Sequence, residues 1–335
     1  MFRDGLLANG ALDVPSQRPL PRSAGRAYVL LILTALAWGA HTVFGRLAVG
    51  QVSPMALVAL RWLSVCILLC TFAGRSLRAD WPLLRPRLLY VGAMGALGFA
   101  VYNALYYSAA HLTTAVNMGI VQGAIPVFVV AGAVVLDSMR INAAQGLGIA
   151  LSLIGVAVVA SAGDLTRILA LTVNLGDLFM LVGCMLYAGY TVALRRAPAV
   201  SPFAMLAVLA AAAFVAALPM AAAEWATGRL RWPTPFGWML VLVIAVVPSL
   251  LAQSFFIRGV RLIGPERAGV FVNLVPVFAA IMGVTFLSEP FETYHAVALG
   301  LVLAGIWLSE RRFGMQGLPV SFDRVTVDAR DNVRP

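Results

Sequence analysis

Apolar runs of about 20 residues, almost free of charged side chains, recur along nearly the whole chain. Each run is long enough to cross a hydrocarbon core about 30 Å thick. Because that core holds no water, every backbone N–H and C=O must be paired within it, which leaves helices or a closed barrel. Barrel strands would show about ten residues of strict alternation, and the sequence lacks this pattern. With 61% hydrophobic and 11% charged residues, the chain is predicted to be an all-α integral membrane protein.

The apolar runs predict ten transmembrane helices. Five lie in the first half of the chain, at Tyr28 to Leu47, Pro54 to Phe72, Leu88 to Ala110, Thr114 to Leu136 and Ala144 to Ala162. The other five lie at Leu175 to Leu194, Pro202 to Ala223, Gly237 to Arg258, Arg267 to Leu287 and Tyr294 to Ser309.

The positive charge of the chain indicates its orientation. All 24 basic residues are arginine, and the net charge is +10, but these arginines are spread over tails and short connections, which does not suggest nucleic acid. Segments on the inner side of a membrane carry most of the arginine and lysine. The predicted helices place most arginines inside if both termini are cytoplasmic, and leave outside only Arg46, Arg167, Arg229 and Arg231, with Arg61 within a helix.

The two halves of the chain repeat each other. Ala124 to Phe128 (Ala-Ile-Pro-Val-Phe) recurs 150 residues later as Leu274 to Phe278 (Leu-Val-Pro-Val-Phe), and the same offset pairs Asn103 with Gln253. Further pairs at nearly the same offset are Ser53-Pro54 with Ser201-Pro202, Trp38 with Tyr187, Thr42 with Thr191, and Gly155 with Gly305. Matches in the same order along five helices predict a duplicated five-helix unit.

An odd number of helices in each unit makes the second unit enter the membrane in the opposite sense. The predicted organisation is a cytoplasmic tail (1–27), a first repeat (28–162), a linker (163–174), a second repeat (175–312) and a cytoplasmic tail (313–335). Two inverted repeats are a common architecture of secondary transporters, in which alternating access opens a midplane site to one side and then to the other.

These features resemble the EamA-type permeases of the drug/metabolite transporter superfamily, over about Tyr28 to Arg311. The residues that carry the resemblance are Trp38-Gly39 with Arg46, Ser53-Pro54 leading to Arg61-Trp62, Pro126, Pro276, and Leu287-Ser288-Glu289 followed by Gly305. The first half departs from the last pattern, because Met139 stands where the counterpart of Glu289 falls. The resemblance implies a secondary carrier of small metabolites, often an exporter of amino acids or related compounds.

Polar and aromatic residues at helical spacing within the runs are the candidates for a solute cavity. They are Trp38, His41, Thr42, Arg61, Asn103, Tyr106, Gln122, Tyr187, Tyr190, Gln253 and Asn273. An alternative for the amides is ordinary packing between helices, and for the tyrosines an interfacial belt. Arg61 lies about 10 Å into its helix, where a charge needs a partner. It is predicted either to lock helix-end carbonyls or to bind a carboxylate in the cavity.

Pro126 and Pro276 lie near the middle of their predicted helices. Each is expected to remove one backbone hydrogen bond and kink the helix, which frees the carbonyl of Gln122 or Val272. Freed carbonyls at the midplane could coordinate a solute; the alternative is that neighbouring helices satisfy them.

The leading hypothesis is a secondary transporter in a bacterial-type inner membrane, and the family resemblance implies that it is an exporter. Its expected partners are a small-molecule solute and membrane lipid, with a homodimer left open, and we expect no cofactor and no metal. An intramembrane enzyme acting on a lipid-linked substrate and a cation-drug efflux carrier are the alternatives. The first would need a nucleophile with a base or a metal cluster, and the second a buried carboxylate at midspan.

Overall fold

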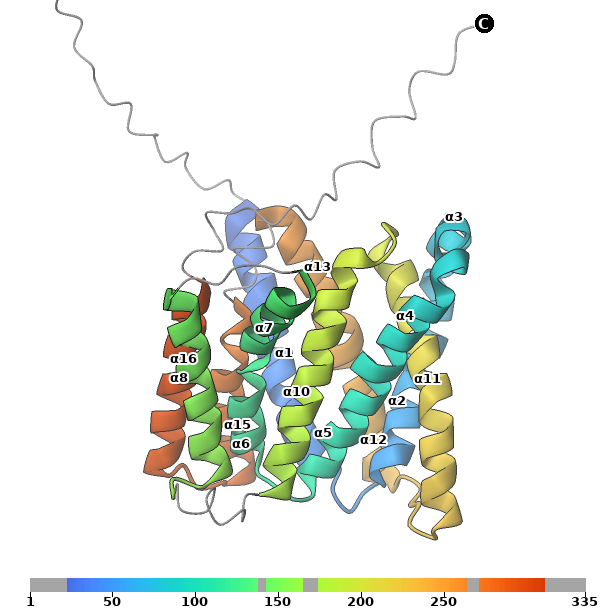
Figure 1. Cartoon of the computed structure of the whole chain (residues 1–335). Coiled ribbons are helices and arrows are strands. Elements are labelled where there is room, and N and C mark those ends of the chain that lie inside the picture. The colour runs from blue at the N-terminus through green and yellow to red at the C-terminus, as the bar shows by residue number, and fades with distance from the viewer. Residues whose placement is uncertain (1–22, 138–142, 165–173, 264–270, 311–335) are drawn as a thin grey trace, which may run out of the picture.

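The computed structural model describes residues 23–137, 143–164, 174–263 and 271–310, and all the regular elements in these ranges are helices (Figure 1). Eight helices among them are long and apolar enough to cross a membrane, and two shorter apolar helices span Val275–Leu287 and Thr293–Leu308. The chain is therefore a multi-pass membrane protein. Residues 1–22 of the predicted N-terminal tail, the C-terminal tail, most of the linker and the start of the predicted ninth helix lie outside the described residues, and residues 23–27 of the predicted N-terminal tail belong to α1.

The helix bounds follow the predicted runs closely. The first half holds α1 (Ser23–Leu47), α2 (Pro54–Phe72), α3 (Gly74–Leu84), α4 (Leu88–Gly95), α5 (Tyr102–Ala110), α6 (Ala115–Gln122), α7 (Ile125–Asp137) and α8 (Ala143–Ala160). The second half holds α10 (Leu175–Ala193), α11 (Pro202–Ala226), α12 (Pro235–Ile244), α13 (Ala252–Ile263), α15 (Val275–Leu287) and α16 (Thr293–Glu310). The third predicted helix begins earlier than expected, because α3 and α4 continue it back to Gly74.

The helices at the two repeated prolines are broken, whereas the sequence predicts kinks. Pro126 is the second residue of α7 and Pro276 the second residue of α15, so each proline starts a new helix. At this position the missing N–H costs nothing, because the first turn of a helix has no partner for it. The expected kinks are thus helix breaks, closed by hydrogen bonds from Ala124 N to Val121 O (3.0 Å) and from Leu274 N to Phe271 O (3.1 Å).

A π-helical segment interrupts one spanning helix in each half, at matching positions. The first, η2, covers Ala96–Val101 between α4 and α5, and the second, η4, covers Ala245–Leu251 between α12 and α13. A π segment disturbs the regular backbone hydrogen bonds of the helix, so that some carbonyls can accept hydrogen bonds from side chains instead. In η4 the carbonyl of Ile244 accepts a hydrogen bond from Ser249 Oγ (2.7 Å), and the carbonyl of Pro248 accepts one from Trp38 Nε1 (3.1 Å).

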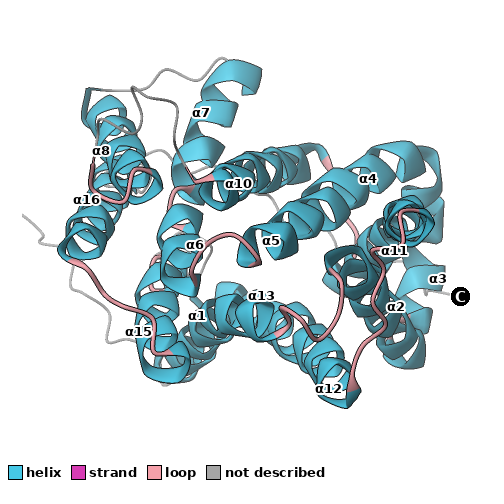
Figure 2. Ribbon diagram, turned by 90° about the horizontal axis from the view of Figure 1, so that it is seen from below, coloured by secondary structure: helices cyan, strands magenta, loops and turns pink. Residues whose placement is uncertain are grey.

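Helices α8 and α16 pack side by side in opposite directions at one edge of the bundle (Figures 1 and 2). A Cβ added at Gly155 would lie 2.9 Å from Ala298 O, and one added at Gly305 would lie 2.5 Å from Gly148 O. The later residue of α8, Gly155, thus contacts the earlier residue of α16, Ala298. The earlier Gly148 contacts the later Gly305, so the two helices are antiparallel. The absence of side chains at the two glycines lets the backbones approach this closely.

Helices α2 and α11 also contact each other in opposite directions. The start of α2 meets the end of α11, where Glu224 accepts hydrogen bonds from Ser53 Oγ (2.6 Å) and Ala56 N (3.2 Å). At the other end of the pair, the rings of Phe72 and Phe203 are 5.7 Å apart. A carboxylate of one helix thereby satisfies the unpaired backbone N–H groups at the start of the other.

The directions of α1 and α10 are opposite as well. The end of α1 contacts the end of α5, because the guanidinium of Arg46 donates a hydrogen bond to Ala110 O. The start of α10 lies near the same place, since Thr113 Oγ1 donates to Asp177 Oδ1 (2.6 Å). We call this end of the bundle, at the bottom of Figure 1, the lower end.

Candidate functional site

Arg61 stands at the centre of a buried polar cluster between the two halves of the chain. Its side chain is 6% exposed, and its Nε donates to Ser249 Oγ of η4 at 3.1 Å. Its Nη1 contacts three acceptors on α1 and α5: His41 Nε2 (3.1 Å), Tyr107 OH (2.8 Å) and Asn103 Oδ1. We call these five residues the central cluster. It joins three elements of the first half to the π segment of the second.

Local structure explains why these side chains meet. Arg61 is the eighth residue of α2, about 10 Å along the helix from Pro54. Asn103 and Tyr107 are four residues apart on α5 and so share one face. The Nδ2 of Asn103 donates to Phe99 O of η2 (2.5 Å), which aims its Oδ1 at the guanidinium. The π segment η4 therefore supplies a partner to Arg61 directly, and η2 holds the side chain of another partner, Asn103.

Aromatic rings form a closed chain of contacts that begins and ends at the central cluster. His41 stacks on Tyr106 at 4.6 Å and 9°, and Trp62 stacks on Phe99 at 4.8 Å and 9°. The guanidinium carbon of Arg61 lies 4.9 Å from the Trp62 ring, within the range of a cation–π contact. The order of contacts is His41, Tyr106, Tyr102, Tyr187, Tyr190, Phe99, Trp62 and Arg61, which returns to His41. We call this set the aromatic circuit.

Several predicted cavity residues belong to these two groups. His41, Arg61 and Asn103 are in the central cluster, and Tyr106, Tyr187 and Tyr190 are in the aromatic circuit. Gln122 joins them through its Nε2, which donates to Tyr102 OH at 2.8 Å. Trp38 lies beside them, with its ring 5.5 Å from Phe256 and its Nε1 on Pro248 O.

Three predicted residues lie differently. Thr42 is fully buried, but its Oγ1 bonds its own helix at Gly39 O (2.7 Å). Gln253, the repeat mate of Asn103, is half-buried and contributes no hydrogen bond to the central cluster. Asn273 lies at the break before α15 and is half-buried. The equivalence of Asn103 and Gln253 in sequence therefore does not extend to their contacts.

The prediction missed Ser249, Tyr107, Trp62 and Phe99 as members of the site. Trp62 follows Arg61 and Tyr107 follows Tyr106, so adjacency was a signal for both. Ser249 had none, because a serine in an apolar run is ordinary and its place beside Arg61 depends on the π segment. Phe99 is the repeat mate of Ser249, 150 residues earlier, but the two side chains have different chemistry.

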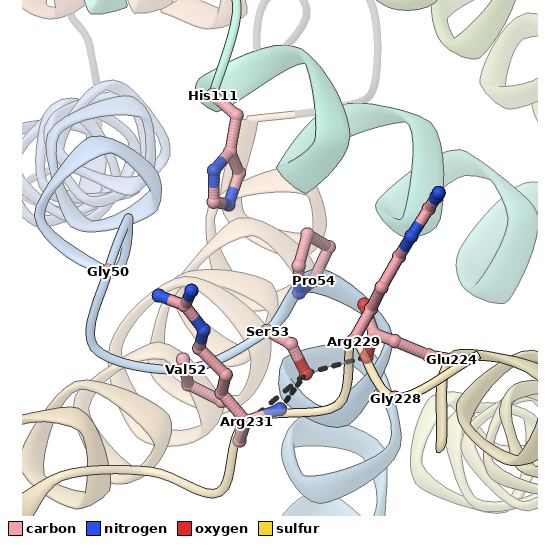
Figure 3. Close-up of a pocket in the computed structure, with 9 residues that line it drawn as sticks. All are labelled: Gly50, Val52, Ser53, Pro54, His111, Glu224, Gly228, Arg229 and Arg231. Carbon is pink, nitrogen blue, oxygen red and sulfur yellow. Dashed lines mark hydrogen bonds between the residues drawn. The ribbon is translucent and has the colours of Figure 1, made fainter. Parts of the chain in front are cut away.

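Two hollows open at the lower end of the bundle. One, of about 480 Å³, is lined by the connection after α1, by His111, and by Glu224, Arg229 and Arg231 (Figure 3). The other, of about 520 Å³, is lined by Arg46, His111, Asn117, Asp177 and Tyr294 with their neighbours. His111 borders both, and it follows Tyr107 of the central cluster by one helical turn. Partial burial and the nearby charge of Arg46 lower the pKa of His111 below its ordinary value of 6.5.

Glu289 ties four elements together beside the second hollow. Its carboxylate accepts hydrogen bonds from Ala115 N (2.8 Å) and Val116 N (3.0 Å) at the start of α6, and it lies 3.7 Å from Arg46 Nε of α1. These contacts join the connection between α15 and α16, in which Glu289 lies, to α6 and α1. The counterpart position in the first half, Met139, lies outside the described residues. A carboxylate at a helix start is favourable because it pairs the unsatisfied N–H groups and faces the positive end of the helix dipole.

The bundle, with its buried polar junction, defines a multi-pass membrane protein. The chain belongs to the EamA-like transporter family, whose pattern matches it twice, at residues 25–161 and 174–311. The resemblance inferred from the sequence is therefore confirmed.

Similar proteins carry transporter names. The chain is 24% identical over 287 residues to the uncharacterized transporter YyaM of Bacillus subtilis, covering 83% of this chain and 92% of that one. It is 26% identical over 292 residues to the uncharacterized inner membrane transporter YedA of Escherichia coli, covering 85% and 89%. A solved crystal structure superposes with a TM-score of 0.57 at 20% identity, over 87% of this chain and 100% of that one, which shows the shared fold.

Proposed function

We propose that the protein is a secondary carrier that moves a small polar organic solute across a bacterial inner membrane by alternating access. In this proposal ten helices cross the membrane as two inverted five-helix repeats, residues 28–162 and 175–312, joined by the linker 163–174. An amino acid or a related metabolite is the proposed solute, and export the proposed direction. The proposed solute cavity is lined by the residues predicted from the sequence, with Ser249, Tyr107 and Trp62 added.

The observation that carries the proposal is the buried polar junction between the halves. Arg61 and Asn103 come from the first half and Ser249 from the second, at midspan where polar groups are expensive. A packed structural protein gains little from such a junction. A carrier needs one, because the solute must exchange its water for side chains that both halves control.

The directions of repeat mates support the inverted arrangement. α8 and α16, α2 and α11, and α1 and α10 are mates by sequence offset, and each pair runs in opposite directions. Two such halves can pack in two near-equivalent ways, one open to each side. The arginine distribution supports cytoplasmic termini, which puts the lower end of the bundle outside.

The two alternatives fit the site less well. A lipophilic cation would meet the positive charge of Arg61 at midspan, with no carboxylate in contact with it among the described residues. An enzyme would need a nucleophile held by a base. The hydroxyl of Ser249 contacts a guanidinium, and the hydroxyl of Tyr107, although 2.9 Å from His41 Nε2, also accepts a hydrogen bond from that guanidinium. The transporter names of similar proteins also favour a carrier.

The test is a stability screen followed by flux. Purified protein is heated with a panel of metabolites, since a solute that binds the folded state raises its apparent stability. Solutes that do so are then loaded into liposomes with and without the protein. Flux that falls in Asn103→Ala at normal expression, and persists in the exposed Thr285→Ala, supports the proposal. Product formation without flux would instead indicate an enzyme.

A further inference from the structure

No carboxylate of the described residues is in contact with Arg61 to balance its charge. All four of its hydrogen-bond partners, Ser249, His41, Tyr107 and Asn103, are neutral acceptors, and a bond to His41 Nε2 requires that this nitrogen carry no proton. Glu289, which forms an ion pair with Arg46, lies at the lower end of the bundle. Burying a guanidinium is costly unless an opposite charge and further hydrogen bonds offset the loss of water.

Part of the guanidinium also has N–H groups without a hydrogen-bond partner among the described residues. Nε and Nη1 make all the hydrogen bonds found for Arg61 in the described part of the chain, and none comes from Nη2, which carries two N–H groups. A carboxylate is bound most strongly by two parallel N–H groups of one guanidinium. In this guanidinium only the N–H groups of Nη2 have no acceptor among the described residues, so Nη2 can donate to a carboxylate oxygen at once. The second, parallel N–H would come from Nε or Nη1, which would have to release an acceptor that it now contacts.

Two further buried donors beside Arg61 lack an acceptor. The hydroxyl of Tyr106, whose side chain is 0% exposed, and Nε1 of Trp62, at 3%, have no hydrogen-bond partner. Tyr106 stacks on His41, and Trp62 lies against the guanidinium. Buried polar groups are normally paired, so these exceptions point to a missing acceptor. Nη2 of Arg61, Tyr106 OH and Trp62 Nε1 are thus donors or can act as donors, and the group that complements such a set is an acceptor with negative charge.

The other rings of the aromatic circuit indicate the chemistry of the part of the ligand that does not contact Arg61. Phe99, Tyr102, Tyr187 and Tyr190 continue away from Arg61, and the tyrosines of α10 come from the second half. Ring faces and edges pack well against an apolar or aromatic body. One guanidinium without a second cation in contact matches one negative charge, which favours a carboxylate over a doubly charged phosphate.

We propose that Arg61 is the anion-binding residue of the transport site, and that the solute is an organic monocarboxylate with an apolar or aromatic body. Nη2 of Arg61, the Tyr106 hydroxyl and Trp62 Nε1 donate to the carboxylate, while the tyrosines of both halves contact the body. This inference rests on the proposed carrier function and names its substrate class.

The test compares carboxylates with their own amides. Purified full-length protein is heated in detergent with phenylacetate, benzoate or hexanoate, and with phenylacetamide, benzamide or hexanamide, at equal concentration and ionic strength. We expect at least one carboxylate to raise the unfolding temperature above its amide and above sodium chloride. If no carboxylate exceeds its amide, the inference is overturned.

Variants identify the residue responsible. Arg61→Gln should weaken binding of the stabilising carboxylate by about 10- to 100-fold, the effect of losing one or two hydrogen bonds to a charged group. Arg258→Gln, which removes an exposed arginine of α13, should leave it unchanged. Should Arg61→Gln not fold, Trp62→Phe and Tyr106→Phe decide, since each removes one donor and should weaken binding about 2- to 10-fold. Unchanged binding in both would overturn the inference.

Flux separates this inference from the carrier function. If liposomes with the protein transport only neutral or cationic solutes, the carrier stands and Arg61 is a structural lock. If a carboxylate binds through Arg61 but no solute crosses, the site stands as an anion site and the carrier function falls. Flux of the carboxylate that Arg61→Gln abolishes supports both.

Discussion

Removing the Glu289 carboxylate should loosen the lower end of the bundle by a calculable amount. Glu289→Ala deletes two hydrogen bonds, to Ala115 N and Val116 N, from a side chain that is 8% exposed. Losing a helix cap costs about 0.5–2 kcal/mol, and a charged acceptor puts the cost at the upper end of this range. The partly exposed ion pair with Arg46 adds no more than about 1 kcal/mol. We expect a loss of about 2–3 kcal/mol.

Thermal unfolding of the purified protein measures this loss. A change of 1 kcal/mol shifts the midpoint by about 2–4 °C in a domain of roughly 200 residues and by less in a longer one, so Glu289→Ala should lower it by about 3–5 °C. Glu289→Gln keeps an acceptor and should lose about half as much. Glu292→Ala removes an exposed acid from the same connection and should have little effect. Equal losses in Glu289→Ala and Glu292→Ala would refute the capping role.

Other predictions concern helix packing, pH and topology. Gly305→Ala should destabilise the folded protein by about 1–3 kcal/mol, because the added Cβ would press on the backbone of α8. Gly300→Ala adds a Cβ in open space and should not destabilise it, so equal unfolding midpoints for the two variants would contradict the close contact. Below pH 6.5 His111 binds a proton more readily in the unfolded chain than in the folded protein, so the stability of the wild type should fall as the pH is lowered. His111→Gln should lose less stability over the same pH range, and parallel pH profiles for the two proteins would contradict this prediction. Reporter fusions after Arg75 and Glu224 should read inside and outside respectively, and the reverse reading would invert the proposed topology.

Much of the fold could be predicted because the membrane leaves the backbone few choices. The apolar runs gave helix bounds close to those of α2, α10 and α16. The glycines of the repeat, Gly155 and Gly305, were visible as a matched pair, and they lie at the closest approach of α8 and α16. Such features depend on local composition and spacing, which a single sequence displays.

The prolines show where local information ends. A proline inside an apolar run predicts a lost hydrogen bond, but it does not say whether the helix bends or stops. At Pro126 and Pro276 it stops, and the preceding turn is closed by hydrogen bonds within Val121 to Ala124 and Phe271 to Leu274. That outcome depends on the packing of the neighbouring helices. The sequence predicted the positions at which the helices are disturbed, but it predicted kinks where the structure has breaks.

The partners of the charged groups could be predicted least. The need of Arg61 for partners was clear, yet Ser249 lies 188 residues away and reaches it only through a π segment. The capping of α2 by Glu224 likewise joins residues that are 168 positions apart in sequence. Contacts of this kind follow from the tertiary arrangement, and no spacing rule within one helix reveals them.

Accessibility of Ser249 from the two sides of the membrane tests alternating access through the central cluster most directly. Cys66, Cys70 and Cys184 are replaced by alanine, Ser249→Cys is introduced, and a membrane-impermeant thiol reagent is applied to right-side-out and inside-out vesicles. We predict labelling from both sides, reduced by a bound solute, while Ala210→Cys in the buried core of α11 stays unlabelled. Labelling of Ser249→Cys from one side only, or from neither, would contradict the carrier account.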